Sequence, residues 1–268
     1  MAKSMDTNGK LTAVPLENRV GGVFIHVTDL TRAAEWYSRL FGLPVRQERL
    51  NSGPVYWFDF PETDLVLDSN AENRKNPSWH EGMKPRFMLP AADIDEAYEY
   101  IKFHANAELL TAPERHGPMA FFTFRDLEGN NLMACWSEEP IANHDQEAAS
   151  PILPRIGGVF VDVKDMKAAA RWYSSLLGQP LNEAGAEHPV YPVPVTGGAA
   201  LLLDQNRHLN GETFTEIMYL ETHDFEAALE HLKSIGVELA GEPAYFENLS
   251  EVPVLDPDGN RIVIAQMK

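Results

Sequence analysis

The chain has 268 residues, of which 44% are hydrophobic and 10% aromatic, a composition typical of a globular protein with a packed core rather than a disordered one. Its 40 Asp and Glu outnumber its 22 Lys and Arg, and the formal charge of −18 disfavours binding to nucleic acid or to anionic membranes. It has no apolar run of the roughly 18 residues that span a bilayer, and its single cysteine, Cys135, fits a reducing compartment, so we predict a cytoplasmic protein.

The first predicted elements are a strand and a helix. Residues 20–28 are rich in Val, Ile and Phe and predict a strand. Asp29 or Thr31 can cap the helix that follows, and Gly42 ends it. Apolar residues in between recur every three or four positions, as expected of a helix packed on a sheet: Ala33, Trp36, Tyr37 and Leu40.

Strand-like runs follow at 55–60, 64–68 and 86–90. Asp93 then caps a second predicted helix, with Glu96 at the capping-box position. A hairpin is predicted to close this part of the chain, with strands at 121–124 and 131–136 joined through the turn 126–130. The order is therefore β-α-β-β-β followed by a second β-α-β-β-β.

The same order then repeats. Residues 19–45 recur as residues 155–181, with 15 identities in 27 aligned positions. The turn DLEGN at 126–130 recurs as DPDGN at 256–260. A fixed period of this length indicates a tandem duplication.

The repeat and the composition between its copies predict the domain boundaries. Residues 1–18 are predicted to be a disordered tail, 19–137 the first module and 155–268 the second. The stretch 138–154 is acidic, contains Ala and Pro, and lacks an apolar period, so it is predicted to be a linker. The fold class is α+β, with two tandem modules of paired βαβββ units.

Three motifs occur in this order: Val-x-Asp-Leu at the end of the first strand, Trp-Tyr-Ser-x-Leu-x-Gly in the helix, and Asp-Pro-Asp-Gly-Asn in the closing hairpin. Their combination resembles the vicinal oxygen chelate superfamily, which includes glyoxalase I, bleomycin-resistance proteins, fosfomycin-resistance enzymes, methylmalonyl-CoA epimerase and extradiol dioxygenases. The resemblance covers both copies. It implies that each module curls into a half-open mixed-sheet barrel whose cavity holds a ligand, but it does not fix the reaction.

The resemblance also implies a divalent metal held by His or Glu side chains, with open positions for substrate oxygens. The first ligand position corresponds to Gly22 and Gly158, and a later one to Met133 and Val263. The intervening position falls in 84–86 or 215–217, where Glu216 is a suitable residue type in an unsuitable register. Glycine, methionine and valine are not ligands for hard metals. We therefore predict no metal centre and no other cofactor, with a displaced metal site as the alternative.

Alternation along the first strand places Gly22, Phe24 and His26 on one face. The residues expected to line the two cavities are Phe24, His26, Arg86, Thr123, Met133, Phe160, Asp162 and Val263. This set is largely apolar and aromatic with a few polar groups, which suits a small organic ligand.

Three of these residues have two interpretations each. His26 is either a general acid or base or a histidine held by hydrogen bonds in the barrel wall. Asp162 either contacts a cationic ligand or forms a structural salt bridge. Arg86 either binds a carboxylate or lies at the rim of the sheet.

Three functions compete. The favoured one is a binding protein, similar to the bleomycin-resistance branch, that holds a small organic molecule in an apolar cup without the metal triad. The alternative is a glyoxalase-like lyase, isomerase or dioxygenase that uses a displaced metal or His26, and the third is a degenerate scaffold. The expected partner is a small-molecule ligand. The chain is expected to be a monomer, whose modules make the contact that single-module relatives make by dimerising, or a homodimer.

Overall fold

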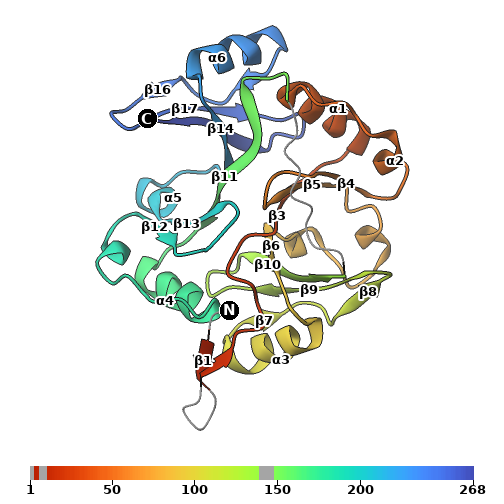
Figure 1. Ribbon diagram of the computed structural model, residues 1–268, viewed down its shortest axis with the longest axis vertical. Helices are drawn as coiled ribbons and strands as arrows, with labels where there is room; N and C mark the ends of the chain where they lie inside the picture. Colours follow the sequence, from red (N-terminus) through yellow and green to blue (C-terminus); the bar gives the residue numbers. More distant parts are fainter. Residues whose placement is uncertain (1–2, 6–10, 139–147) are drawn as a thin grey trace.

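The computed structural model describes residues 3–5, 11–138 and 148–268. Within these ranges the chain forms two sheets of eight strands each and a separate two-stranded hairpin, β1 (Lys3–Met5) with β2 (Leu11–Ala13). The predicted α+β class with two tandem modules is confirmed (Figure 1). None of the described helices is long and apolar enough to span a membrane.

The sheet of the first module runs, in spatial order, through β4 (Val55–Phe58), β5 (Asp64–Asp68), β3 (Gly22–His26), β6 (Phe87–Pro90), β10 (Asn131–Ser137), β9 (Met119–Arg125) and β7 (Glu108–Leu109), with β8 (Glu114–His116) paired to β9. Parallel and antiparallel pairs are mixed: β3 is parallel to β5 and antiparallel to β6, which is parallel to β10. Its helices are α1 (Leu30–Phe41), α2 (Gln47–Leu50) and α3 (Ile94–His104). In the described residues the two edges of this sheet do not pair with each other, so the barrel stays half-open.

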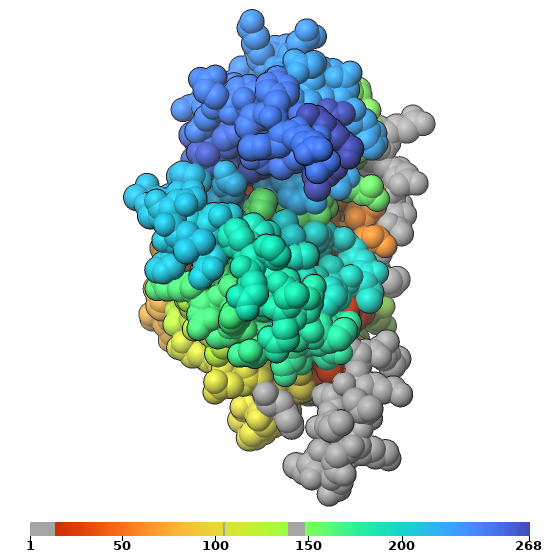
Figure 2. Space-filling view, turned by 90° about the vertical axis from the view of Figure 1, so that its left-hand side faces the viewer, coloured from red at the N-terminus to blue at the C-terminus, as the bar shows by residue number. Residues whose placement is uncertain are grey.

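The second module repeats this order with β12 (Val190–Val193), β13 (Ala200–Asp204), β11 (Ile152–Asp162), β14 (Glu216–Thr222), β18 (Arg261–Met267), β17 (Leu249–Leu255) and β15 (Glu238–Leu239), and β16 (Ala244–Tyr245) pairs with β17. Its helices are α4 (Met166–Leu176), α5 (Asn206–Asn210) and α6 (Phe225–Ser234). Figure 2 shows the outer face of this module, with its second half (blue) above its first half (green to cyan).

The first unit of each module differs from the predicted βαβββ order. After α1, only β4 and β5 precede β6 among the described residues. Short 3-10 turns, η1 (Asn73–Lys75) and η2 (Glu81–Met83), occupy the remaining stretch. In the second module the corresponding stretch contains α5, and a 3-10 turn, η3 (Gly185–Glu187), precedes β12. These connections are where the two copies diverge most.

The helices form as the capping residues predict. Asp29 accepts a hydrogen bond from Arg32 N, and Gly42 takes the left-handed conformation with φ 64° that ends α1. Asp93 accepts from the amides of Asp95 and Glu96 at the start of α3. The predicted caps therefore fix both ends of α1 and the start of α3.

The core lies between each sheet and its helices. Val23 and Ile25 of β3 are fully buried on the helix-facing side, as alternation requires. Gly22, Phe24 and His26 occupy the opposite, concave face. Aromatic side chains from α1 and β4 fill this core, including Tyr37, Phe41, Tyr56 and Phe58.

The modules are crossed, so that the first helix of each lies against the second half of the other (Figure 1). The buried Tyr37 hydroxyl of α1 donates to Asp256 Oδ2 at 3.0 Å, and the buried Tyr173 hydroxyl of α4 donates to Asp126 Oδ2 at 2.8 Å. Both aspartates belong to the repeated turn. The duplication therefore creates two corresponding junctions, one at each copy of the repeated turn.

Parts of the predicted tail and linker pack on this core. Val14 and Leu16 are buried, and Glu17 N donates to Pro90 O at 2.7 Å. Ser150 donates to the carbonyl of Leu40 at 2.7 Å, and β11 begins at residue 152. Of the predicted linker, residues 139–147 lie outside the described residues.

Candidate ligand-binding site at the module junction

The carboxylate of Asp162 is the centre of a charged cluster at one junction. Asp162 ends β11, and its Oδ2 accepts from Arg86 Nη2 at 3.3 Å and from Arg207 Nη1 at 3.2 Å. Thr215 Oγ1 donates to the same oxygen at 3.1 Å, and Arg86 Nη1 donates to the carbonyl of Phe160 at 2.8 Å. Because Arg86 precedes β6 and Arg207 lies in α5, one carboxylate connects the first module, the second sheet and a short helix.

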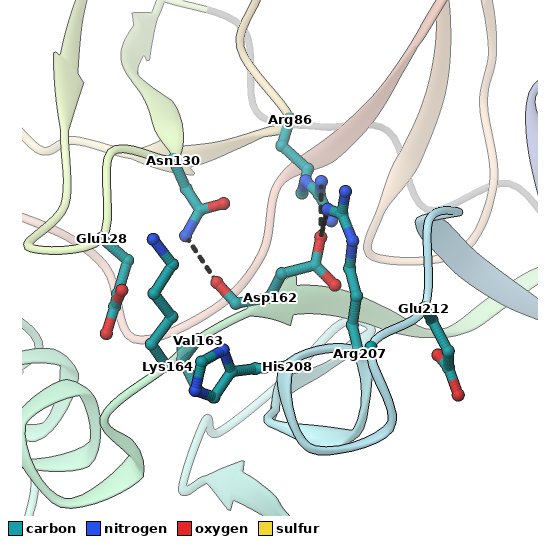
Figure 3. A pocket seen from close by; sticks show the side chains of 10 residues that line it. Arg86, Glu128, Asn130, Asp162, Val163, Lys164, Arg207, His208 and Glu212 are labelled. Carbon is teal, nitrogen blue, oxygen red and sulfur yellow. Dashed lines mark hydrogen bonds and ion pairs between the residues drawn. The ribbon is translucent and has the colours of Figure 1, made fainter.

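A pocket of about 450 Å³ lies beside this cluster (Figure 3). Both modules contribute to its wall, which is lined by Arg86, Glu128, Asn130, Asp162, Val163, Lys164, Arg207, His208, Gly211 and Glu212. Its volume is within the range of small-molecule sites. Unlike the apolar cup expected from the sequence, this pocket is lined mainly by ionic and polar side chains.

The repeated turn of the first module fixes one wall of the pocket. Asn130 Nδ2 donates to Asp126 Oδ2 at 2.9 Å and to the carbonyl of Asp162 at 3.0 Å. Glu128 Oε1 accepts the amide hydrogen of Asp165 at 2.9 Å. The turn therefore holds the end of β11, and with it the Asp162 carboxylate, in place.

The equivalent junction is held more tightly. Asn260 donates to the carbonyl of His26 at 3.1 Å, as Asn130 does to Asp162. Asp258 Oδ1, at the position equivalent to Glu128, accepts from the amide and hydroxyl of Thr28 and lies 2.9 Å from Arg32 Nη2. Through these contacts the segment after β3 and the start of α1 both bind the repeated turn of the second module directly.

His26 is held on both ring nitrogens. Nε2 lies 2.7 Å from the carbonyl of Pro85, which can only accept, so Nε2 carries the proton. Nδ1 accepts from Asn70 Nδ2 at 3.0 Å. Burial lowers the pKa of His26 to about 4, although the hydrogen bond to Pro85 acts in the opposite direction. The ring is therefore neutral at pH 7, and acid–base catalysis would require one of these bonds to break.

The strand register shows which residues lie side by side at the positions where the family resemblance implies metal ligands. Gly22 is paired with Met88, which is paired with Met133, across β3, β6 and β10. The middle position is thus Met88 rather than a residue of 84–86, and the Met88 side chain fills the space next to Gly22.

The second module has the equivalent row of Gly158, Tyr219 and Val263. The middle position is Tyr219 rather than a residue of 215–217, and its ring covers Gly158. Glu216 instead pairs with Arg261 at 3.1 Å. Burial raises the pKa of Tyr219, which disfavours the phenolate that a metal would need. Neither row supplies the donor set of a divalent metal site, and among the described residues no three His, Cys, Asp or Glu side chains converge as ligands.

The structure brings together three of the predicted site residues, Arg86, Phe160 and Asp162. Phe160 and Asp162 also line a cavity of about 20 Å³ inside the second module. Of the predicted residues, Arg86 and Asp162 line the 450 Å³ pocket, and six do not: Phe24, His26, Thr123, Met133, Phe160 and Val263. Phe24, Thr123 and Val263 are buried in the sheets.

The pocket residues missing from the sequence prediction are mainly Lys164, Arg207, Glu128 and Glu212. Lys164 and Glu128 lie within the repeated segments 155–181 and 126–130, and this location is the signal that could have identified them. Arg207 and Glu212 lie around α5, where the two copies have little sequence in common, so the repeat gave no guide to them.

A family profile identifies the family of the chain, and similar solved structures share its fold. The profile of the Glyoxalase/Bleomycin resistance protein/Dioxygenase superfamily matches residues 19–134 and 155–264. No curated protein sequence matches the chain.

Similar solved structures include a catechol 2,3-dioxygenase, with a TM-score of 0.60 and 12% identity over 93% of this chain and 88% of the other. The 2,3-dioxygenase LapB from Pseudomonas sp. KL28 gives 0.60 and 12% over 95% and 93%. The Mn(II)-bound glyoxalase from Novosphingobium aromaticivorans gives 0.57 and 12% over 95% and 82%. At this identity the likeness concerns the fold alone. Since the family profile matches both modules, the chain belongs to the Glyoxalase/Bleomycin resistance protein/Dioxygenase superfamily, as a tandem two-module member.

Proposed function

We propose that this protein binds a small polar organic molecule in the pocket between its two modules, without a divalent metal in either sheet. The observation that carries the proposal is the 450 Å³ pocket, to which both modules contribute charged side chains. The volume is that of a small-molecule site, in which polar groups fix the orientation of the ligand, and here polar and ionic groups make up most of the lining.

The contents of the concave faces support binding without a metal. The Gly22–Met88–Met133 row presents thioethers, and the row in the second module presents Tyr219 between a glycine and a valine. A hard divalent ion prefers carboxylate or imidazole ligands.

Arg207 provides the test of the site. Arg207→Met removes the charge and keeps much of the side-chain length, while Arg32→Met makes the same change at the other junction, where Arg32 pairs with Asp258. The two arginines are comparably exposed, at 41% and 48%.

The experiment is thermal unfolding of the wild type and both variants against a library of small polar metabolites. A ligand at 100 times its dissociation constant stabilises the fold by about 2.7 kcal/mol, enough for a shift in Tm of a few degrees. We expect Arg207→Met to lose this shift and Arg32→Met to keep it. Equal shifts in both variants would place the ligand elsewhere and overturn the proposal.

Metal content tests the second half of the proposal. The untagged protein is dialysed against zinc, nickel, manganese and iron and analysed by mass spectrometry. We expect retention well below one ion per chain. Near-stoichiometric retention of a metal ion would contradict the proposal if Met88→Ala or Tyr219→Phe changed the amount retained. That result would favour the enzymatic alternative.

A further inference from the structure

We infer that the ligand of this pocket is a small zwitterion that carries a carboxylate or phosphate group together with an ammonium group. The inference rests on the proposed function and specifies its ligand class. It is carried by the sign and placement of the ionic side chains around the pocket.

The lining contains ionic groups of both signs in equal number. The cations are Arg86, Lys164 and Arg207, and the carboxylates are Asp162, Glu128 and Glu212. A ligand with a single charge would pair with lining groups of one sign only, whereas a ligand with both charges can pair with both signs.

Asp162 is already engaged within the protein. Its Oδ2 accepts from Arg86, Arg207 and Thr215, so this cluster of two guanidinium groups and one carboxylate has a net charge of +1. Lys164 adds a second positive charge beside it. Together these groups form a cationic region that suits an anionic ligand group, and a guanidinium can bind a carboxylate or a phosphate equally well.

Glu128 and Glu212 supply the opposite charge at the sides of the pocket. In Figure 3 they lie on opposite sides, with Lys164, Arg86 and Arg207 between them. Glu128 uses Oε1 to accept from Asp165, and Glu212 uses Oε1 to accept from Asn210. Each has a second carboxylate oxygen that can accept from an ammonium group.

The charge of the whole chain favours the same ligand class. At −18 the protein repels a free anion at long range, whereas a zwitterion with one ammonium and one carboxylate or phosphodiester carries no net charge and approaches without that penalty. Once bound, its anionic group can pair with the cationic region and its ammonium group with Glu128 or Glu212.

The experiment uses isothermal titration calorimetry on the full chain. The probes are the amino acids with uncharged side chains and glycerophosphoethanolamine, whose phosphodiester carries one negative charge. The best binder is then compared with its N-acetyl derivative and, for an amino acid, with its carboxamide. We expect at least one zwitterion to bind, and each singly charged derivative to bind about tenfold more weakly.

Charge-removing variants assign the two ends of the ligand. Glu128→Gln with Glu212→Gln keeps the amide oxygens as acceptors, and we expect it to remove the preference for the free ammonium group over the N-acetyl form. Lys164→Gln should reduce the preference for the free acid over the carboxamide. Glu99→Gln, in α3 and ion-paired to Lys102 away from the pocket, is the matched control and should change neither preference.

The possible failures are distinguishable. If no zwitterion of the panel binds, or if a derivative binds as tightly as its parent, the ligand class is wrong. If in that case a metabolite from the broader screen still depends on Arg207, the proposed function stands without this inference. If no ligand depends on Arg207, both are wrong.

Discussion

The two junctions between the modules share one framework but differ in what surrounds it. In each, a buried tyrosine of one module donates to the aspartate that begins the repeated turn of the other. In each, the asparagine that ends the turn holds the last residue of the opening strand, His26 or Asp162. Around Asp258 the strand end and helix are drawn onto the turn, whereas around Glu128 a pocket of about 450 Å³ remains.

The comparison indicates how a duplicated fold acquires one distinct site. Residues that hold the modules together recur in both copies, and substitutions at the strand ends change the chemistry. His26 is satisfied by its own module, through Pro85 and Asn70. Asp162 instead recruits arginines from both modules. Three predictions test this difference.

The largest expected effect concerns His26. Its pKa is about 4 in the folded protein, because of burial, and 6.5 in the unfolded chain. The unfolded state therefore binds more protons between these values, and the free energy of unfolding should fall by about 3 kcal/mol as pH drops from 6.5 to 4. Chemical denaturation at several pH values measures this contribution as the difference between wild type and His26→Gln.

Asp64 provides the reason to measure a difference rather than one curve. Burial raises the pKa of Asp64 to about 7, against an ordinary 3.8, so the folded state binds more protons over this range. Its contribution is present at low pH and is lost as pH rises towards 7, which opposes the His26 slope. An identical pH dependence for wild type and His26→Gln would show that His26 is not buried as a neutral ring.

An intermediate effect is expected at the shared framework. Tyr37→Phe and Tyr173→Phe each remove a buried hydroxyl and leave an aspartate with one donor fewer, so each should cost about 1–2 kcal/mol of unfolding free energy. Urea denaturation measures both. Tyr245→Phe, whose hydroxyl bonds Glu226 on the surface, is the control and should change little. A loss at one junction only would contradict their equivalence.

The smallest expected effect is a difference in stability between variants of the two repeated turns. Asp258→Ala removes the acceptor of the Thr28 amide and hydroxyl and the partner of Arg32, and should cost about 1 kcal/mol. Glu128→Ala removes the acceptor of the Asp165 amide at the junction with the pocket, and about 0.5 kcal/mol is expected. Urea denaturation of both variants gives the difference. A larger cost at Glu128 would mean that the turn beside the pocket carries more of the junction's stability.

Most of the fold could be predicted because its signals are local. The Asp29 cap, the apolar stripe of α1 and the left-handed Gly42 depend on neighbours along the chain, and the repeat confirms each assignment in a second copy. The predicted βαβββ order of the first unit differs from the structure, because the stretch between β5 and β6 folds into short turns and adds no strand among the described residues.

The candidate site was only partly predictable, since it depends on contacts between distant segments. Alternation along β3 placed Phe24 and His26 on the concave face, but it could not show that Met88 would fill the space beside Gly22. The middle position implied for a metal ligand was predicted only approximately in each module. The strand register places Met88 and Tyr219 there, and spacing in the sequence could not show this.

By itself the sequence determined the duplication, the α+β class and the family, because repeated motifs and apolar periods are properties of the chain. The tertiary structure alone decided that the modules cross, that Arg86 reaches Asp162 across 76 positions, and that Arg207 meets the same carboxylate from a short helix. The physical reason is that an ion pair depends on separation in space. Separation along the chain says little about it until packing has fixed where each element lies.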